Sequence, residues 1–282
     1  METQLERKAD CSEAEWAARQ DLAACYRIFD LLGWSESIYN HITLRVPGEE
    51  AFLINPFGLL WSEVTASNLV KIDSDGNKLC GSPHPVNLAG FTQHSVFHKR
   101  LPWAHAIVHT HTPDTMAVCS SEEGLTPTNF YSCFFEGAIG YHDFEGITVR
   151  AEEGERLIQN IGNKQVLMLR NHGPVVMAPT LPAMFLSYYM LQRACEIQVK
   201  TNALGNPITV PPEVVEVHQR DRDQMLTADF GKLDFEGITV RAEEGERLVR
   251  NIGNKRVLML RNHGPVVMIT TRSLMCSTTP RS

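Results

Sequence analysis

The sequence lacks several features that mark common functional classes. Its 282 residues carry 26 Lys and Arg against 33 Asp and Glu, which gives a net charge of -7 and a pI of about 5.9. No stripe of basic residues runs along the chain. Proteins that bind nucleic acid typically present such a stripe, so nucleic acid is not expected as a partner. No apolar run approaches the roughly 20 residues that cross a bilayer, so a membrane span is not expected either.

Targeting and disulfide signals are also missing. Residues 1–6 lack the apolar core of a signal peptide. The 7 cysteines are odd in number and include no Cys-x-x-Cys pair. This usage is typical of reduced, mostly buried thiols in a cytoplasmic protein, and it argues against structural zinc on cysteine. The 11 histidines are the better candidates for binding a metal.

The strongest positive signal is a His-x-His pair, His109 and His111, that follows the apolar run 106–108. Side chains alternate along a strand, so these two imidazoles are expected on one side and Thr110 on the other. Two imidazoles one strand step apart suit two cis positions on a single metal ion. A pair of unrelated surface or core histidines is the alternative. His172 follows a second apolar run, 166–169, and is a third candidate.

Periodicity predicts a chain of alternating strands and helices. Ser12 and Glu15 form a capping box for a helix that ends near Gly33. A hairpin is expected from two strands before residue 55, and residues 126–141 are expected to be a loop with apolar anchors. The other predicted elements are a strand ending at residue 73, buried strands at 166–169 and 175–177, and helices at 87–100, 114–119, 151–160 and 181–203.

One segment of the chain occurs twice. Residues 143–177 recur as residues 234–268 with only three differences: Ile158 against Val249, Gln159 against Arg250, and Gln165 against Arg256. Structural repeats normally diverge further, so a recent duplication or a misassembled gene model is the better explanation. The expected organisation is a flexible N-terminus at 1–11, a domain at 12–228, an accessory duplicate at 229–268 and a disordered tail at 269–282.

Six stretches in order resemble the class II aldolase/adducin family over roughly residues 12–220. They are 41–48, 53–58, 63–67, 87–91, 106–111 and 170–173. The resemblance implies an α/β fold, a three-layer α/β/α sandwich with a mainly antiparallel central sheet. It also implies a homo-oligomer, most often a tetramer. The aromatic residues Phe130, Tyr131, Phe134 and Phe135 are expected to be exposed in each subunit and to be covered by the assembly.

The resemblance further implies a divalent metal, usually Zn²⁺ with Mn²⁺ or Fe²⁺ as alternatives, held by three histidines. These carry over onto His109, His111 and His172. The aldolases also place a glutamate ahead of the His-x-His strand as a proton acceptor, and that position falls at Gly90. Loss of a general base typically costs about 10²–10⁴-fold in rate. The chain therefore resembles most closely a branch of the family that includes the adducins.

Five further residues are candidates for the site. Tyr141 lies where a family tyrosine can act as an acid from a neighbouring subunit, although a packed aromatic is the alternative. His84, between two prolines, could reach the vacated side of the metal or remain an exposed loop residue. Asn40, Thr43 and Ser82 fall near segments that bind phosphate or carboxylate in the aldolases. The family's glycine-rich and double-serine patterns are absent, so a phosphorylated substrate is not supported.

Two hypotheses of different classes follow from this pattern. The first is a divalent-metal-dependent lyase-type enzyme, aldolase-like or decarboxylase-like, acting on a small hydroxy acid, keto acid or sugar-like molecule. The second is an adducin-head-like structural and oligomerisation module, associated with the cytoskeleton and without catalysis. Three histidines in coordinating positions favour the first, and Gly90 favours the second. Only one of the duplicated histidines, His172 and His263, is needed for one ion, and His172 is the expected ligand.

Overall fold

A computed structural model describes residues 11–146, 150–237, 257–260 and 264–267. The chain divides into two compact units, the first ending at Glu236 and the second beginning at Gly237. The boundary lies beyond the residue 228 expected from the sequence. Phe230 and Phe235 explain the difference, because they are 9% and 5% exposed and belong to the core of the first unit.

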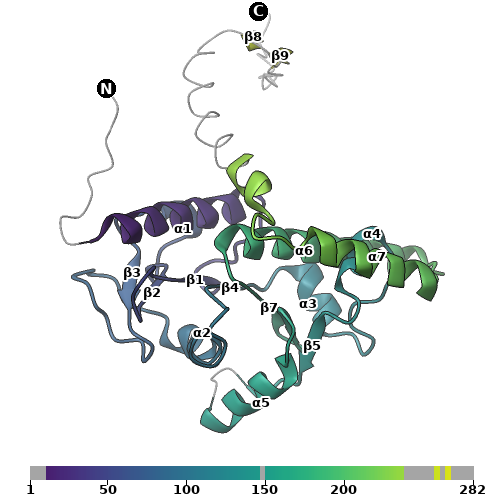
Figure 1. The fold of residues 1–282 in the computed structure, drawn as a ribbon, viewed down its shortest axis with the longest axis horizontal. Helices are drawn as coiled ribbons and strands as arrows, with labels where there is room; N and C mark the ends of the chain where they lie inside the picture. The colour runs from purple at the N-terminus through teal and green to yellow at the C-terminus, as the bar shows by residue number, and fades with distance from the viewer. Residues whose placement is uncertain (1–10, 147–149, 238–256, 261–263, 268–282) are drawn as a thin grey trace, which may run out of the picture. The chain divides into compact units, whose positions relative to one another are not determined.

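A seven-stranded sheet lies at the centre of the first unit (Figure 1). All neighbouring strands in it are antiparallel except one parallel pair, β5 and β6. This arrangement confirms the predicted α/β class and the mainly antiparallel sheet. In spatial order the strands are β3 (Val70–Ile72), β2 (Phe52–Ile54), β1 (His41–Arg45), β4 (Ala106–His109), β7 (Gly173–Ala178), β6 (Val166–Leu169) and β5 (Ile139–His142).

Helices cover both faces of the sheet, as Figure 1 shows. One face carries α1 (Glu13–Leu31), α3 (Pro113–Cys119) and α6 (Leu181–Leu204), and the other carries α2 (Leu88–Arg100) and α5 (Ala151–Ile161). Helix α4 (Phe130–Phe135) packs against α6, and α7 (Pro212–Met225) packs against α4. A single 3-10 turn, η1 (Trp61–Glu63), contacts α1. The predicted three-layer sandwich is therefore present.

The start of α1 shows how local and long-range contacts combine. Ser12 caps the helix as predicted, because its hydroxyl accepts a hydrogen bond from the Glu15 amide at 3.1 Å. The Glu15 carboxylate is instead buried, 2.8 Å from both Arg19 and Lys71. Burial alone would raise the pKa of Glu15, but hydrogen bonds from Lys71 and Arg19 outweigh it and lower that pKa. This ion pair network ties α1 to β3.

Residues 126–141 differ from the predicted loop. Asn129 begins a helix there, because its side chain accepts from the Ser132 amide at 3.0 Å and the Ser132 hydroxyl accepts from the Asn129 amide. Helix α4 and strand β5 occupy most of the segment. The expected exposed aromatic patch is also wrong: Phe134 and Phe135 are buried within the first unit, while Phe130 is 68% exposed. Their burial removes this argument for an oligomer.

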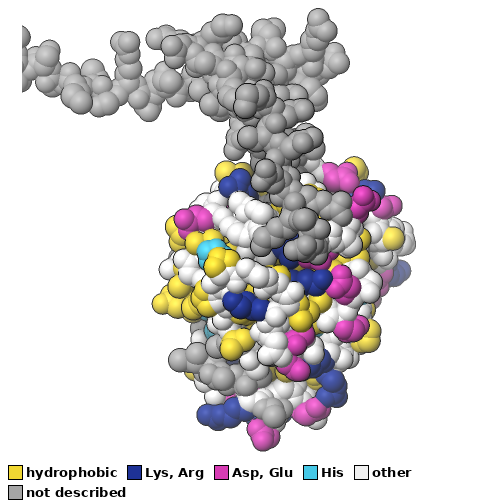
Figure 2. Space-filling view, turned by 90° about the vertical axis from the view of Figure 1, so that its left-hand side faces the viewer, with side chains coloured by type: hydrophobic (Ala, Val, Ile, Leu, Met, Phe, Trp, Pro, Cys, Tyr) yellow, Lys and Arg dark blue, Asp and Glu magenta, His cyan; other side chains and the backbone are white. Residues whose placement is uncertain are grey.

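The second unit contains a small hairpin. Strand β8 (Val257–Leu260) pairs with β9 (Gly264–Val267) in antiparallel order. His263 and the expected disordered tail at 269–282 lie outside the described residues, as do residues 1–10. The described chain includes no helix with the length and apolar composition needed to cross a membrane. On the face drawn in Figure 2, basic and acidic side chains are interspersed, without a continuous basic stripe.

Candidate metal site

Three histidines meet at one end of the β4–β7 strand pair. His109 is the last residue of β4, His111 follows two residues later, and His172 lies in the turn between β6 and β7. Their candidate ligand nitrogens all lie within 4.8 Å of one another. The ring centroids are 4.7 to 4.9 Å apart. The structure therefore brings together the three residues that the sequence selected.

The turn before β7 has a backbone that few residues could adopt. Asn171 has a φ of 56°, in the left-handed region that asparagine tolerates best after glycine. Gly173 lies so close to β4 that an added Cβ would be 2.3 Å from the Thr110 carbonyl oxygen. Any larger residue would push the turn away. The Asn-His-Gly sequence thus places His172 against the His-x-His segment.

Hydrogen bonds assign the tautomers of two of these rings. Nδ1 of His109 donates to the Pro174 carbonyl at 3.0 Å, and Nδ1 of His111 donates to the Glu36 carboxylate at 3.1 Å. In both rings this leaves Nε2 as a bare lone pair. The two Nε2 atoms nevertheless face each other at 2.9 Å. Two lone pairs at that distance repel unless a positive charge lies between them.

All three imidazoles are held in the neutral, ligating form. Burial lowers the pKa of His109 well below its usual value, and the nearby His172 and His111 lower it further. Burial lowers the pKa of His172 to about 4, and also lowers that of His111 although Glu36 opposes this. Three neutral nitrogens with the other positions open are the donor set of catalytic zinc, and Mn²⁺ or Fe²⁺ also accept imidazole. The donor set therefore fits a divalent cation.

Sequence reasoning missed the carboxylate that supports this set. Glu36 lies 75 residues from His111 in sequence, in the connection between α1 and β1. A carboxylate that accepts from the far nitrogen of a ligating histidine fixes its ring and makes it a stronger donor. The sequence around Glu36 carries no motif, so only the fold reveals the contact.

A second group of histidines lies directly behind the first. His41 of β1 is the register partner of His109, so both side chains are on the same face of the sheet. Its ring centroid is 5.5 Å from that of His109 and 4.2 Å from that of His94 on α2. His41 fills the space beside Gly90: an added Cβ there would be 2.7 Å from its ring.

Thr43 is placed to support these histidines. It is completely buried, and its hydroxyl lies 2.8 Å from His94 Nδ1 and 2.7 Å from His98 Nε2. His98 Nδ1 donates to the Ala104 carbonyl, so Nε2 accepts from Thr43, whose oxygen in turn accepts from His94 Nδ1. The hydroxyl is thus fully used inside the protein, which leaves it no free donor for the substrate contact expected from the sequence.

The other expected residues lie around this centre in different settings. Asn40 is 1% exposed, and neither atom of its side-chain amide has a hydrogen-bond partner. Ser82 is buried and accepts from the His84 amide at 3.4 Å. Among the described residues, the ring of His84 is not part of the metal-binding group. The Tyr141 hydroxyl accepts from the Leu125 amide at 3.0 Å.

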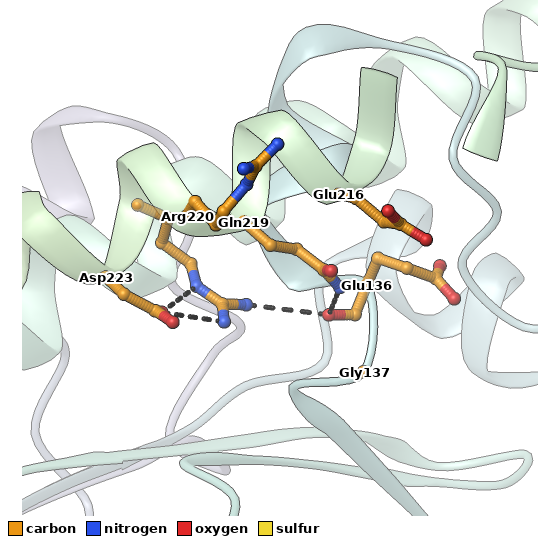
Figure 3. Close-up of a pocket in the computed structure, with 7 residues that line it drawn as sticks. Glu136, Gly137, Glu216, Gln219, Arg220 and Asp223 are labelled. Atoms are coloured by element: carbon orange, nitrogen blue, oxygen red, sulfur yellow. Dashed lines mark hydrogen bonds and ion pairs between the residues drawn. The ribbon is translucent and has the colours of Figure 1, made fainter. Parts of the chain in front are cut away.

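A pocket elsewhere on the surface belongs to different elements. It lies between α7 and the end of α4, where Gln219 and Arg222 donate to the Glu136 carbonyl at 2.9 and 3.5 Å (Figure 3). Its lining is charged and includes none of the three clustered histidines. Among the described residues its carboxylates do not converge into a metal-binding group, so the histidine cluster is the stronger candidate for function.

Comparison with known proteins identifies relatives of two kinds, aldolase class 2 proteins and adducins. A protein from Caulobacter vibrioides whose name places it in aldolase class 2 is 41% identical over 232 residues, which cover 82% of this chain and 90% of that protein. Alpha-adducin from Rattus norvegicus is 48% identical over 200 residues, covering 69% of this chain and 27% of alpha-adducin. The match to alpha-adducin therefore concerns only a part of that longer protein.

Solved structures show the same fold. An aldolase II superfamily protein from Pseudomonas syringae superposes with a TM-score of 0.76 at 35% identity, covering 87% of this chain and 95% of that structure. An L-fuculose 1-phosphate aldolase from Glaciozyma antarctica superposes with a TM-score of 0.72 at 26% identity, covering 86% and 95%. Residues 20–199 match the family described as Class II Aldolase and Adducin N-terminal domain, and this chain belongs to that family.

Proposed function

We propose that this protein is a divalent-metal-dependent lyase-type enzyme, aldolase-like or decarboxylase-like, that acts on a small hydroxy acid, keto acid or sugar-like molecule. The observation that supports it most directly is the 2.9 Å approach of the His109 and His111 Nε2 atoms, both bare lone pairs. That arrangement is favourable when a positive charge, either a metal ion or a shared proton, lies between the two nitrogens. Zn²⁺ is the first choice and Mn²⁺ or Fe²⁺ are alternatives.

Each residue of the centre has a separate task. His109, His111 and His172 hold neutral nitrogens toward one point, while Pro174 and Glu36 fix the first two rings by accepting from their Nδ1 atoms. When bound, a divalent cation would supply Lewis-acid stabilisation of negative charge on a substrate oxygen. Tyr141 of a neighbouring subunit is proposed as an acid, with His84 as a further candidate catalytic group and Asn40 and Ser82 as substrate contacts.

The metal should be tested before the reaction. Elemental analysis of the purified protein is expected to give about one divalent ion per chain. His109→Ala should remove it, whereas His105→Ala, on an exposed residue of the same segment, should not. Full metal content in the His109 variant would contradict the proposal. Aldol and decarboxylation substrates should then be screened with the loaded protein.

A second candidate function is an adducin-head-like module without catalysis. Gly90 favours it, because glycine cannot transfer a proton where the aldolases carry a glutamate, and so does the 48% identity with alpha-adducin. Under this proposal the metal would be structural, the protein would turn over none of the screened substrates, and cytoskeletal binding would be measurable by cosedimentation. Turnover that His172→Ala abolishes would exclude it.

The proposal also covers the oligomeric state and the location of the protein. We expect a cytoplasmic homo-oligomer, most simply a tetramer, with each metal site near a subunit boundary. Sedimentation at micromolar concentration should give a mass of about four chains. A monomer under these conditions would contradict the expectation and would also remove the proposed role of Tyr141.

A further inference from the structure

Position 90 and position 41 form a sterically matched pair. A Cβ at Gly90 would be 2.7 Å from Cε1 of His41 and 2.9 Å from its Nδ1, closer than real contacts allow. A glutamate at position 90 therefore cannot coexist with the His41 ring as it is placed. The imidazole lies where the side chain of the aldolase glutamate would begin.

His41 is buried in a way that a purely structural histidine rarely is. It is 3% exposed, and neither ring nitrogen makes a hydrogen bond of good geometry, although the backbone at Tyr39 and Gly90 lies close to the ring. The adjacent His94 also has a buried, unpaired Nε2, because Thr43 takes its Nδ1. An unpaired buried polar group destabilises the folded state, and such groups in native proteins normally serve a ligand or an ordered water.

The placement of His41 points to a ligand atom rather than to the metal itself. The coordinating group of the described residues contains His109, His111 and His172 but not His41. His41 nevertheless shares the register position of His109, with ring centroids 5.5 Å apart. It therefore borders the metal centre beside His109.

Charge then distinguishes between possible ligands. The side chains that form the centre are neutral imidazoles. The carboxylate that hydrogen-bonds to one of them, Glu36, is half exposed and accepts from His111 Nδ1. A glutamate at position 90 would cancel part of the charge of a divalent cation. Its replacement by an imidazole leaves that charge uncompensated, which favours an anionic ligand.

We propose that His41 takes the place of the aldolase glutamate as a substrate-contacting group, and that the bound molecule is therefore a small carboxylate, a hydroxy acid or keto acid rather than an uncharged sugar. In this arrangement a ring N–H of His41 donates to a carboxylate oxygen of the ligand, and His94 packs behind the ring. The inference rests on the proposed metal-dependent function, and it narrows the substrate class of the same site.

Oxalate and the uncharged dihydroxyacetone are suitable probes. Their binding to the zinc-loaded full-length protein should be measured by calorimetry, together with zinc content. We expect oxalate to bind at least about tenfold more tightly than dihydroxyacetone, since one charge-assisted hydrogen bond is worth about that factor. Equal affinities, with zinc present, would overturn the inference and leave the metal proposal intact. Absence of zinc from the wild-type protein would instead contradict the proposed function.

His41→Phe keeps a planar ring beside Gly90 and removes both nitrogens. It should retain zinc and lose about tenfold or more in oxalate affinity, while His105→Phe on the surface should change neither. Unchanged oxalate affinity in His41→Phe would overturn the inference. If His41→Phe fails to fold, His41→Leu, which also removes both ring nitrogens, provides the same comparison.

A double-mutant cycle tests the matched pair itself. Gly90→Glu should lower the unfolding temperature because of the clash with His41, and His41→Ala/Gly90→Glu should recover it. The double variant restores a carboxylate, so its zinc content should persist while oxalate binds at least about tenfold more weakly. Additive effects on unfolding would show that the two positions do not share the space, and oxalate affinity at the wild-type level would show that charge does not select the ligand.

Discussion

Nearly the same sequence occurs in two settings in this chain, as residues 143–177 and as residues 234–268. In the first copy, β6 and β7 pair Val166 with Val176 and Leu169 with Gly173. In the second, β8 and β9 pair Val257 with Val267 and Leu260 with Gly264, which is the same register. The hairpin is therefore encoded locally, by the β-branched and apolar residues of the two strands and by the turn between them.

The start of the two copies differs although the sequence is identical. Residues 143–146 are irregular and follow β5, and Phe144 is 49% exposed with its ring centroid 5.9 Å from that of His172. Residues 234–237 are helical, and Phe235 is 5% exposed, 5.8 Å from Phe185 of α6. Surroundings thus decide the conformation of this tetrapeptide.

The largest expected difference between the copies concerns the metal. His172→Ala should reduce the metal content from about one ion per chain to background, because two imidazoles alone rarely hold a divalent ion. His263→Ala, at the equivalent position of the second copy, should leave it unchanged. Elemental analysis of both variants after dialysis measures this directly. The opposite pattern would identify the second copy as the functional one.

Stability should separate the two phenylalanines. Phe235→Ala removes a buried ring from the contact with Phe185 and should cost about 3–5 kcal/mol. Phe144→Ala changes a half-exposed side chain and should cost less than about 1 kcal/mol. Urea unfolding of the two variants gives both values. Equal costs would mean that the helical packing of residues 234–237 contributes nothing.

Two truncations test the same contact. A chain that ends after Glu236 retains Phe230 and Phe235 and should keep the stability and the metal of the full chain. A chain that ends after Phe230 loses the Phe235 contact and should be destabilised by at least the Phe235→Ala value. Comparable unfolding midpoints would argue against this boundary.

Acid should lower the free energy of unfolding of the first unit. Burial lowers the pKa of His98 to about 3, and the nearby charge of Arg45 lowers it further, although the hydrogen bond to the Ala104 carbonyl opposes this. The unfolded chain binds this proton near pH 6.5 and the folded chain does not. Stability therefore falls as the pH falls from about 6.5 toward 3, by about 1.4 kcal/mol per unit for each such histidine.

His98→Gln should remove one such increment from the slope of unfolding free energy against pH. A chain ending after Glu236 keeps His98 with its partners Thr43 and Ala104, so the contribution of this histidine should be the same there as in the full chain. Urea unfolding at pH 7, 6, 5 and 4 provides the slopes. An unchanged slope in His98→Gln would show that this histidine is not the one that titrates.

Local signals in the sequence predicted a large part of this structure. Ser12 caps α1 as predicted, the helix expected at 87–100 is α2, and the apolar runs before His109 and His172 are buried strands. These features depend on residues within one or two turns of each other, where spacing alone carries the information. The grouping of His172 with His109 and His111 was instead expected from the family resemblance, because it depends on the pairing of β4 with the distant strand β7.

Contacts between distant segments could not be predicted in this way. Glu36 meets His111 across 75 residues, and His41 meets Gly90 across β1 and α2. Helix α4 was missed because Phe134 and Phe135 resemble loop anchors until Phe230 and α6 are seen to cover them. In each case a partner elsewhere in the chain, rather than a local pattern, determines the role of the residue.

The smallest expected effect is that of the three substitutions that distinguish the two copies. Replacing Ile158, Gln159 and Gln165 with the Val, Arg and Arg of the second copy makes the first copy identical to it. Ile158, a residue of α5, packs against the core, so the loss of one methylene there should cost about 0.5–1.5 kcal/mol. Replacement of the two glutamines should contribute little. The triple variant should retain its metal in elemental analysis, because none of the three positions contacts the histidine cluster in the described interactions. Retention would show that β4, with His109 and His111 beside it, makes the first copy functional. Loss of metal at normal stability would place the cause in the three substitutions, and the surroundings would then be the lesser influence.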